Sequence, residues 1–238
     1  MQRKKFLKNS ILLLGSSSLI LNACKKTTTS DGGTTGNCLA APNETEGPYP
    51  YVGGEITNPL QRADITAGQT GLPLSLNFVI VNSNNNCAAV NGARVDIWHC
   101  NKDGYYSGYG NQVGGALGGT QSYVGQTWLR GFQLADTAGK AQFITIYPGW
   151  YQGRATHIHI EVFVNGVLKK ATQITFAETV SDAVHVTPLY SAHGINSMRT
   201  ASDGIFNNSA TDMANETVAL TGNTTAGYTG TYQVGVAL

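Results

Sequence analysis

Hydrophobic and polar residues alternate along several short stretches of the chain. In residues 74–80 apolar side chains occupy every second position, and the polar run 82–86 follows. A period of two predicts a strand with one buried face. An Asn-Gly dipeptide at 165–166 divides the strand-like runs 157–164 and 167–176, which is a strong hairpin signal. No long window has a helical period, so the pattern predicts an all-β domain.

The amino-terminal residues follow a different pattern. Four basic residues precede two short apolar runs, residues 11–14 and 19–21, and Asn22 and Ala23 follow directly before Cys24. This arrangement is typical of a lipoprotein-type signal peptide over residues 1–23, too short to be a comfortable membrane span. Residues 24–37 are rich in Thr, Gly, Ser and Lys and predict a flexible tether, and residues 38–238 are predicted to form one domain.

Lipidation of Cys24 after cleavage would anchor an exported protein to a membrane, on the periplasmic side or at the cell surface. The sequence leaves open which membrane carries the lipid and whether export follows the Sec or the twin-arginine route. The precursor has a formal net charge of +1. Removal of the signal peptide takes away four bases and no acid, which leaves eleven bases against fourteen acids. Such a domain carries no nucleic-acid-binding footprint.

The remaining cysteines suit an exported protein. Cys38, Cys87 and Cys100 are an odd set, so at most one disulfide forms within the chain. Cys87 and Cys100 fall near opposite ends of a predicted strand, which is too far for a bridge. The sequence leaves the pairing of Cys38 open, and our choice is a disulfide between Cys38 and Cys87 with a buried thiol at Cys100.

Residues 147–160 contain the most informative chemistry. In a strand, His157 and His159 project from one face, while the intervening isoleucine turns to the apolar core. Tyr151, just upstream, is placed to supply a phenolate oxygen to the same point. Mixed imidazole and phenolate donors favour a hard, oxidised cation such as Fe(III). A His-x-His pair alone is more often a solvated sheet face, so the interpretation needs a further donor.

A second segment offers that donor. The strand-like run 95–100 enters a turn signal at 101–104, and Tyr105 and Tyr106 follow at once. A tyrosine leaving such a turn is well placed to face a strand end from another part of the chain, and Tyr106 is our candidate fourth ligand. His99 lies on the strand-like run and is expected to be a hydrogen-bonded structural residue. His185 and His193 lack a partner at ligand spacing, so all three histidines are left out of the metal site.

These motifs resemble the iron-site motifs of the intradiol ring-cleavage dioxygenases, the family of the protocatechuate and catechol dioxygenases. The resemblance runs from about Cys38 to at least Phe206, and its blocks occur in the family's order. The blocks are residues 44–49, 95–107, 128–132, 136–139, 145–160 and 172–176.

The resemblance implies a role for each matching residue. The implied ligands of a non-haem Fe(III) cofactor are Tyr106, Tyr151, His157 and His159. Tyr105 adjoins Tyr106 and either could in principle be the ligand, but the glycine-x-tyrosine-serine spacing favours Tyr106. The implied catalytic residues are Tyr151, which would act as a base, and Arg154 and Gln173, which would sit beside the substrate. The implied lining of the substrate pocket is Gly47, Pro48 and Tyr49.

The resemblance also implies the fold and the reaction. We expect an antiparallel β-sandwich with long active-site loops and without an amino-terminal helical dimerisation segment. The implied reaction is the cleavage of a catechol-type aromatic by O2 between its two hydroxylated carbons, which yields a cis,cis-muconate-type dicarboxylate. The ring substituents of the substrate and the oligomeric state stay open.

An alternative of a different class remains. The chain could be a lipid-anchored β-sandwich binding module for a glycan or a protein, with a structural metal or none. Four ligand candidates at suitable spacing are harder to obtain by chance than two, which favours the enzyme.

Overall fold

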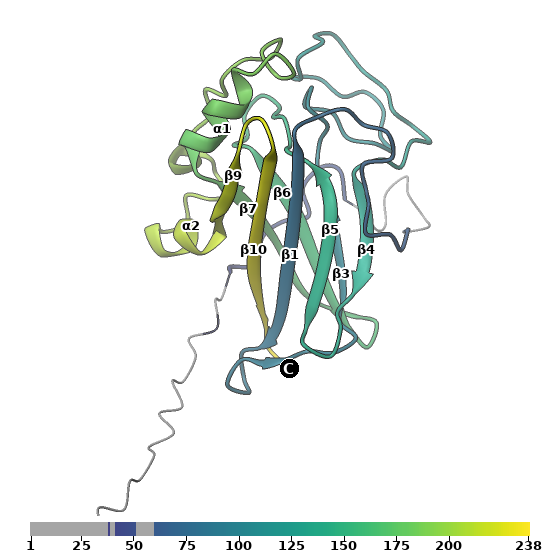
Figure 1. The fold of residues 1–238 in the computed structure, drawn as a ribbon, viewed down its shortest axis with the longest axis vertical. Helices are drawn as coiled ribbons and strands as arrows, with labels where there is room; N and C mark the ends of the chain where they lie inside the picture. The colour runs from purple at the N-terminus through teal and green to yellow at the C-terminus, as the bar shows by residue number, and fades with distance from the viewer. Residues whose placement is uncertain (1–37, 39–40, 51–59) are drawn as a thin grey trace, which may run out of the picture. The chain divides into compact units, whose positions relative to one another are not determined.

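The computed structural model describes Cys38, residues 41–50 and residues 60–238. The predicted signal peptide (1–23), the predicted lipidation site Cys24 and the predicted tether (24–37) lie outside the described residues. Within the described domain, two five-stranded sheets lie one in front of the other, and the labels of Figure 1 follow both layers.

The first sheet is organised around the long strand β1 (Pro73–Asn82). β10 (Gly227–Val236) pairs with β1 on one side, and β9 (Leu220–Asn223) continues beyond β10. On the other side β1 pairs with β5 (Lys140–Ile146) and with the short β2 (Ala88–Ala89). β1 and β10 run parallel, whereas the other pairs of this sheet are antiparallel.

The second sheet carries the motif that the sequence singled out. Its strands lie in the order β4-β3-β6-β7-β8. They are β4 (Arg130–Leu134), β3 (Arg94–Trp98), β6 (His157–Val164), β7 (Val167–Phe176) and β8 (Thr217–Val218). The antiparallel pairing of β3 with β6 puts Trp98 opposite His159.

The hairpin expected at the Asn-Gly dipeptide is confirmed. Asn165 and Gly166 join β6 to β7 with φ of 53° and 75°, the left-handed conformations that a type I′ turn requires. The all-β sandwich is also confirmed, but β7 and β8 pair in parallel, so both sheets are mixed rather than purely antiparallel. Parallel neighbours arise here because β8 and β10 reach their partners through long connections.

The apolar core lies between the two sheets. The alternation in residues 74–80 of β1 buries Leu74, Leu76, Phe78 and Ile80 almost completely. Ile158 and Ile160 of β6 join the same cluster, each with no exposed surface. Burying a side chain of this size contributes about 1.5–3 kcal/mol, so this core fixes the register of both sheets and therefore which face of β6 points outward.

Among the residues that the structure describes, helical structure is limited to short segments on the carboxyl side of β7. These are α1 (Glu178–His185), the 3-10 turn η1 (Thr200–Ser202) and α2 (Ala210–Glu216). In Figure 1, α1 lies at the end of the sandwich where long loops also gather. In the part of the chain that the structure describes, no helix has the length and apolar character needed to cross a membrane.

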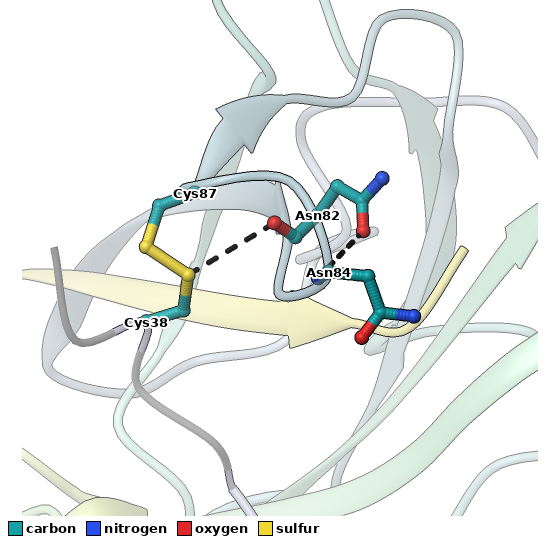
Figure 2. Close-up of a disulfide and its surroundings, with 4 residues drawn as sticks. All are labelled: Cys38, Asn82, Asn84 and Cys87. Carbon is teal, nitrogen blue, oxygen red and sulfur yellow. Dashed lines mark hydrogen bonds between the residues drawn. A yellow bond between two sulfur atoms is a disulfide. The ribbon is translucent and has the colours of Figure 1, made fainter. Parts of the chain in front are cut away.

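The expected disulfide between Cys38 and Cys87 is present, with the two Cα atoms 5.5 Å apart (Figure 2). Sγ of Cys38 lies 4.0 Å from the carbonyl oxygen of Asn82, the last residue of β1. Cys100 is a buried free thiol, as predicted. Two strands, β2 and β3, occupy the stretch between Cys87 and Cys100, where the sequence suggested one.

Candidate metal centre

Two histidines lie side by side on the face of β6 that points away from the core. Because Ile158 and Ile160 enter the core, His157 and His159 project from the opposite face. Neither is exposed, since their side chains are covered by other parts of the chain. The indole of Trp98 stacks on the His159 ring with 4.9 Å between centroids and 3° between planes, which fixes the orientation of that ring.

The turn after β3 delivers Tyr106 to the histidines. Oδ1 of Asn101 accepts hydrogen bonds from the backbone N–H groups of Asp103 and Tyr105, which closes the turn. Gly104, at φ +88°, lies so near the 148–151 segment that a Cβ would come within 2.0 Å of the Trp150 carbonyl oxygen. The turn that leads to Tyr106 and the turn that leads to Tyr151 therefore pack backbone against backbone.

Tyr106 is held in place from its own backbone. The side chain of Gln112 accepts a hydrogen bond from the backbone N–H of Tyr106 and donates one to the backbone carbonyl oxygen of Tyr106, each 2.7 Å long. The structure thus brings Tyr106, and not the neighbouring Tyr105, to the histidine pair. The buried Tyr105 ring packs near Tyr123 instead.

Three donor atoms converge on one point. The hydroxyl oxygen of Tyr106 lies 3.1 Å from Nε2 of His157 and 3.2 Å from Nε2 of His159, and the two Nε2 atoms are 3.1 Å apart. Donors about 2.1 Å from a shared transition-metal ion, and roughly at right angles to one another, lie about 3 Å apart. The triangle has the size that a metal-binding face requires.

The protonation of this triangle favours a cation at its centre. Nδ1 of His157 donates to the carbonyl oxygen of Ala155 at 2.6 Å, so its Nε2 presents a lone pair to the other donors. Burial lowers the pKa of both histidines well below the usual value, which keeps the imidazoles neutral. The three short contacts among these atoms would each need a proton to become a hydrogen bond, but at most two protons are present, one on Tyr106 and one on His159. A metal ion at the centre would instead accept a lone pair from every donor atom.

The phenols of the site are hard to ionise without such a cation. Burial raises the pKa of Tyr106 well above its usual value, and burial raises that of Tyr151 to about 12. The positive charge of Arg154 opposes both shifts. Among the described residues, no group of three or more His, Cys, Asp or Glu side chains could hold a metal, so a metal here depends on tyrosine oxygens. Phenolate and imidazole donors suit an oxidised first-row metal, and the residues fit Fe(III).

Tyr151 lies beside the triangle. Its ring packs edge-on to those of His157 and Tyr106, with centroids 5.6 and 5.9 Å away. Nη1 of Arg154 lies 3.5 Å from the hydroxyl oxygen of Tyr151, and Nη2 of Arg154 donates to Oε1 of Gln173 at 2.7 Å. The structure therefore brings the implied base and the two implied pocket residues together, next to the three donor atoms.

The segment expected to line the pocket lies against the same group. Gly47, at φ +73°, packs on His159 so closely that a Cβ would lie 3.0 Å from Cε1. Tyr49 stacks on Tyr106 with 4.7 Å between ring centroids. Pro48, between them, is exposed. Residues 45–50, the covering segment, therefore exclude water from one side of the triangle formed by the three donor atoms.

Arg130 fixes that covering segment. Its Nη1 and Nη2 donate to the carbonyl oxygens of Pro50 and Tyr49, each at 3.1 Å, and its Nε donates to the carbonyl oxygen of Ser107 at 3.1 Å. The guanidinium also lies 5.8 Å from the centroid of the Tyr106 ring. One buried cation therefore links the covering segment to the tyrosine loop.

Comparison with known proteins agrees with this geometry. No family model matches the chain. Among solved structures, an intradiol ring-cleavage dioxygenase from Tetranychus urticae is 26% identical and has a TM-score of 0.71, over 83% of this chain and 94% of that protein. The chain belongs to the intradiol ring-cleavage dioxygenase family. Members of this family are oxidoreductases, so the protein is an enzyme.

More distant structures share the fold of this intradiol dioxygenase. The dioxygenase domain of a dioxygenase carbohydrate-binding protein fusion from Streptomyces sp. SirexAA-E is 21% identical, with a TM-score of 0.58 over 84% of this chain and 99% of that one. A catechol 1,2-dioxygenase from Pseudomonas arvilla C-1 is 18% identical, with a TM-score of 0.52 over 83% of this chain and 62% of that one.

The histidines left out of the metal site have other surroundings in this dioxygenase. His99 is buried, with Nδ1 2.8 Å from the carbonyl oxygen of Cys100 and Nε2 2.7 Å from Oγ1 of Thr145, a structural role. The His193 ring stacks on Trp150, with centroids 3.6 Å apart. His185 ends α1 and packs near Tyr147, 6.2 Å between ring centroids.

Three residues that organise the site were not assigned a role from the sequence. Arg130 lies inside residues 128–132, one of the blocks that resemble the family, so the sequence could have indicated a role for it near the site. Gln112 and Asp203 lie in loops without any periodic pattern or motif, and only the folded chain brings them to Tyr106 and Arg154.

Proposed function

We propose that this dioxygenase cleaves a catechol-type aromatic with O2 between its two hydroxylated carbons and yields a cis,cis-muconate-type dicarboxylate. The atoms balance, because both oxygens of O2 enter the product and nothing leaves. The observation that carries the proposal is the buried triangle of Tyr106, His157 and His159, with Tyr151 and Arg154 beside it.

Tyr106, Tyr151, His157 and His159 would hold a non-haem Fe(III) cofactor. When bound, ferric iron supplies Lewis acidity, which draws electron density from a chelated diol and makes its ring reactive toward O2. Two phenolates and, in the resting state, one hydroxide would balance the three positive charges of Fe(III), and the neutral imidazoles add none, so burial of the site would cost little solvation free energy.

The protein side chains have separate tasks in this scheme. Tyr151, as a phenolate, would accept one of the two diol protons at its own Oη, and hydroxide derived from solvent would take the other. Arg154 is always cationic and stabilises negative charge that builds up on the reacting ring. Gln173 accepts a hydrogen bond from Arg154 and donates one from Nε2 to the carbonyl oxygen of Thr45 at 2.8 Å, so it joins the guanidinium to the covering segment.

The test combines metal analysis, absorption and oxygen uptake on the full chain supplied with iron. Phenolate bound to ferric iron absorbs visible light, so the wild-type protein is expected to be coloured and to contain stoichiometric iron. Tyr106→Phe should bleach or shift the band and abolish turnover, because it removes a donor. Tyr105→Phe is the matched control, since it deletes a buried hydroxyl one residue away that has no hydrogen-bond partner in the structure.

A colourless wild-type protein without stoichiometric iron would contradict the proposal and favour a binding module. A panel of catechol, hydroxyquinol and protocatechuate then identifies the ring substituents by oxygen uptake. Equal colour and activity in both tyrosine variants would remove Tyr106 from the ligand set.

We also propose that the enzyme is exported and anchored through lipidated Cys24. The signal-like pattern of residues 1–23 and the polar tether of residues 24–37 support this location. The disulfide between Cys38 and Cys87 supports an oxidising compartment.

A further inference from the structure

Arg154 forms an ion pair with a carboxylate from a distant part of the chain. Oδ2 of Asp203 accepts a hydrogen bond from Nε of Arg154 at 2.9 Å and another from the backbone N–H of Ala155 at 2.6 Å. Its Oδ1 accepts from the N–H of Ile205 at 2.8 Å. Asp203 lies 49 positions after Arg154 in the sequence.

This ion pair is shielded from water. The Asp203 side chain is 0% exposed and that of Arg154 is 15% exposed. The ring of Phe206 lies 5.8 Å from Cζ of Arg154 and covers the guanidinium from the same segment. A buried charge without its partner is costly, so this pairing holds Arg154 more firmly than an exposed ion pair would.

The contacts of the guanidinium fix its direction. Nε is committed to Asp203 and Nη2 to Gln173, and Nη1 then lies 3.5 Å from the Tyr151 hydroxyl. Because the guanidinium is planar and rigid, two anchored nitrogens determine where the third one points. The carboxylate of Asp203 is therefore one of two anchors that aim Arg154 at the reacting region.

We propose that Asp203 is a positioning residue of this enzyme, which orients Arg154 and acts on the substrate only through it. This inference rests on the proposed function, since it assigns to Arg154 the stabilisation of charge on the diol ring. Asp203 is one residue past η1, so the segment after α1 contributes to a site whose other parts come from β6, β7 and the turn after β3.

The test uses Asp203→Asn in the full, iron-supplied chain. Its kcat for the preferred diol is expected to fall about 100-fold with little change in KM, because misplacement of a catalytic group by about 1 Å has an effect of this size. Iron content and the visible band should match the wild type, since Asp203 is not a ligand. The control is Asp182→Asn, which breaks an ion pair of the same length but greater exposure, Arg199 Nη1 to Asp182 Oδ1 at 2.8 Å, with side chains 39% and 32% exposed. The control should keep wild-type kcat.

A double-mutant cycle isolates the route of the effect. If Asp203 acts only through Arg154, then Arg154→Gln combined with Asp203→Asn should be no slower than Arg154→Gln alone. Multiplicative losses in the double variant would overturn the inference, as would a wild-type kcat in Asp203→Asn.

A second readout needs neither iron nor turnover. An arginine-selective dicarbonyl reagent, followed by peptide mass mapping of the metal-free chain, should modify Arg154 faster in Asp203→Asn than in the wild type, while Arg199 reacts at an unchanged rate. Faster reaction at both arginines would show general loosening and would overturn the positioning role. If Asp203→Asn does not fold, Asp203→Glu serves in its place, since it keeps the charge and moves the carboxylate by one methylene.

The two proposals fail separately. A wild-type protein that binds iron but cleaves no diol in the panel contradicts the proposed function. An active wild type with an equally active, folded Asp203→Asn contradicts only the inference about Asp203.

Discussion

Replacing Gly104 by alanine is expected to separate the loop that carries Tyr106 from the turn that carries Tyr151. The new Cβ would lie 2.0 Å from the Trp150 carbonyl oxygen, where real contacts of this kind stay beyond 3.0 Å, so the two backbones must part by about 1 Å. The φ of +88° adds a cost of its own, since a side chain is disfavoured there.

The expected magnitude follows from these two effects. The left-handed conformation costs about 1–2 kcal/mol for alanine, and overpacking costs about 1–3 kcal/mol. The free energy of unfolding should fall by about 2–5 kcal/mol, which lowers the melting temperature of a domain of this size by about 10 °C. The same 1 Å displacement of a catalytic group should reduce kcat by about 100-fold.

Thermal denaturation and oxygen uptake measure both effects, and Gly68→Ala is the control. Gly68 has a similar φ, +81°, but a Cβ there would meet no atom within 4 Å. The control should lose only the conformational part, about 1–2 kcal/mol, and keep its activity. Equal destabilisation of the two variants would show that the close approach at Trp150 does not hold the loop.

Two further predictions concern parts of the chain outside the site. Burial, with Glu44 nearby, raises the pKa of the unpartnered Glu216 carboxyl to about 8. The pKa of Glu216 is higher in the folded than in the unfolded chain, so the free energy of unfolding falls as the pH rises from about 4.5 to about 8. In Glu216→Gln the midpoint of urea denaturation should therefore depend less on pH across that window. A pH profile equal to that of the wild type would contradict this prediction. Cys24→Ala should move the enzyme from the membrane to the soluble fraction on fractionation of the expressing cells, and continued sedimentation with membranes would exclude the lipid anchor.

Local rules determine much of this protein from its sequence. The period of two places Ile158 in the core and the neighbouring histidines on the other face, because successive side chains of a strand alternate. The hairpin after β6 follows from the conformations that only Asn and Gly adopt readily at positions 165 and 166. Counting cysteines and the short reach of a disulfide excluded a bridge between Cys87 and Cys100, and the fold then selected Cys87 as the partner of Cys38.

Other features depend on contacts between residues far apart in the chain. The parallel pairing of Leu74 with Tyr228 joins strands separated by most of the domain, and no local pattern encodes it. The sequence offered both Tyr105 and Tyr106 as ligands. The close approach at Gly104 and the side chain of Gln112 bring only the second one to the histidines.

The sequence by itself determined the alternating strands β1, β6 and β7, the facing histidines and the set of candidate donors, because these depend on the alternation of side chains and on residue chemistry. The tertiary structure alone decided that three donor atoms lie within 3.2 Å of one another, and that Asp203 forms an ion pair with Arg154, which lies 49 positions before it. Such meetings depend on how loops close over a packed core. Loop closure is governed by close packing and by hydrogen bonds between segments, which leave no periodic trace in the amino-acid order.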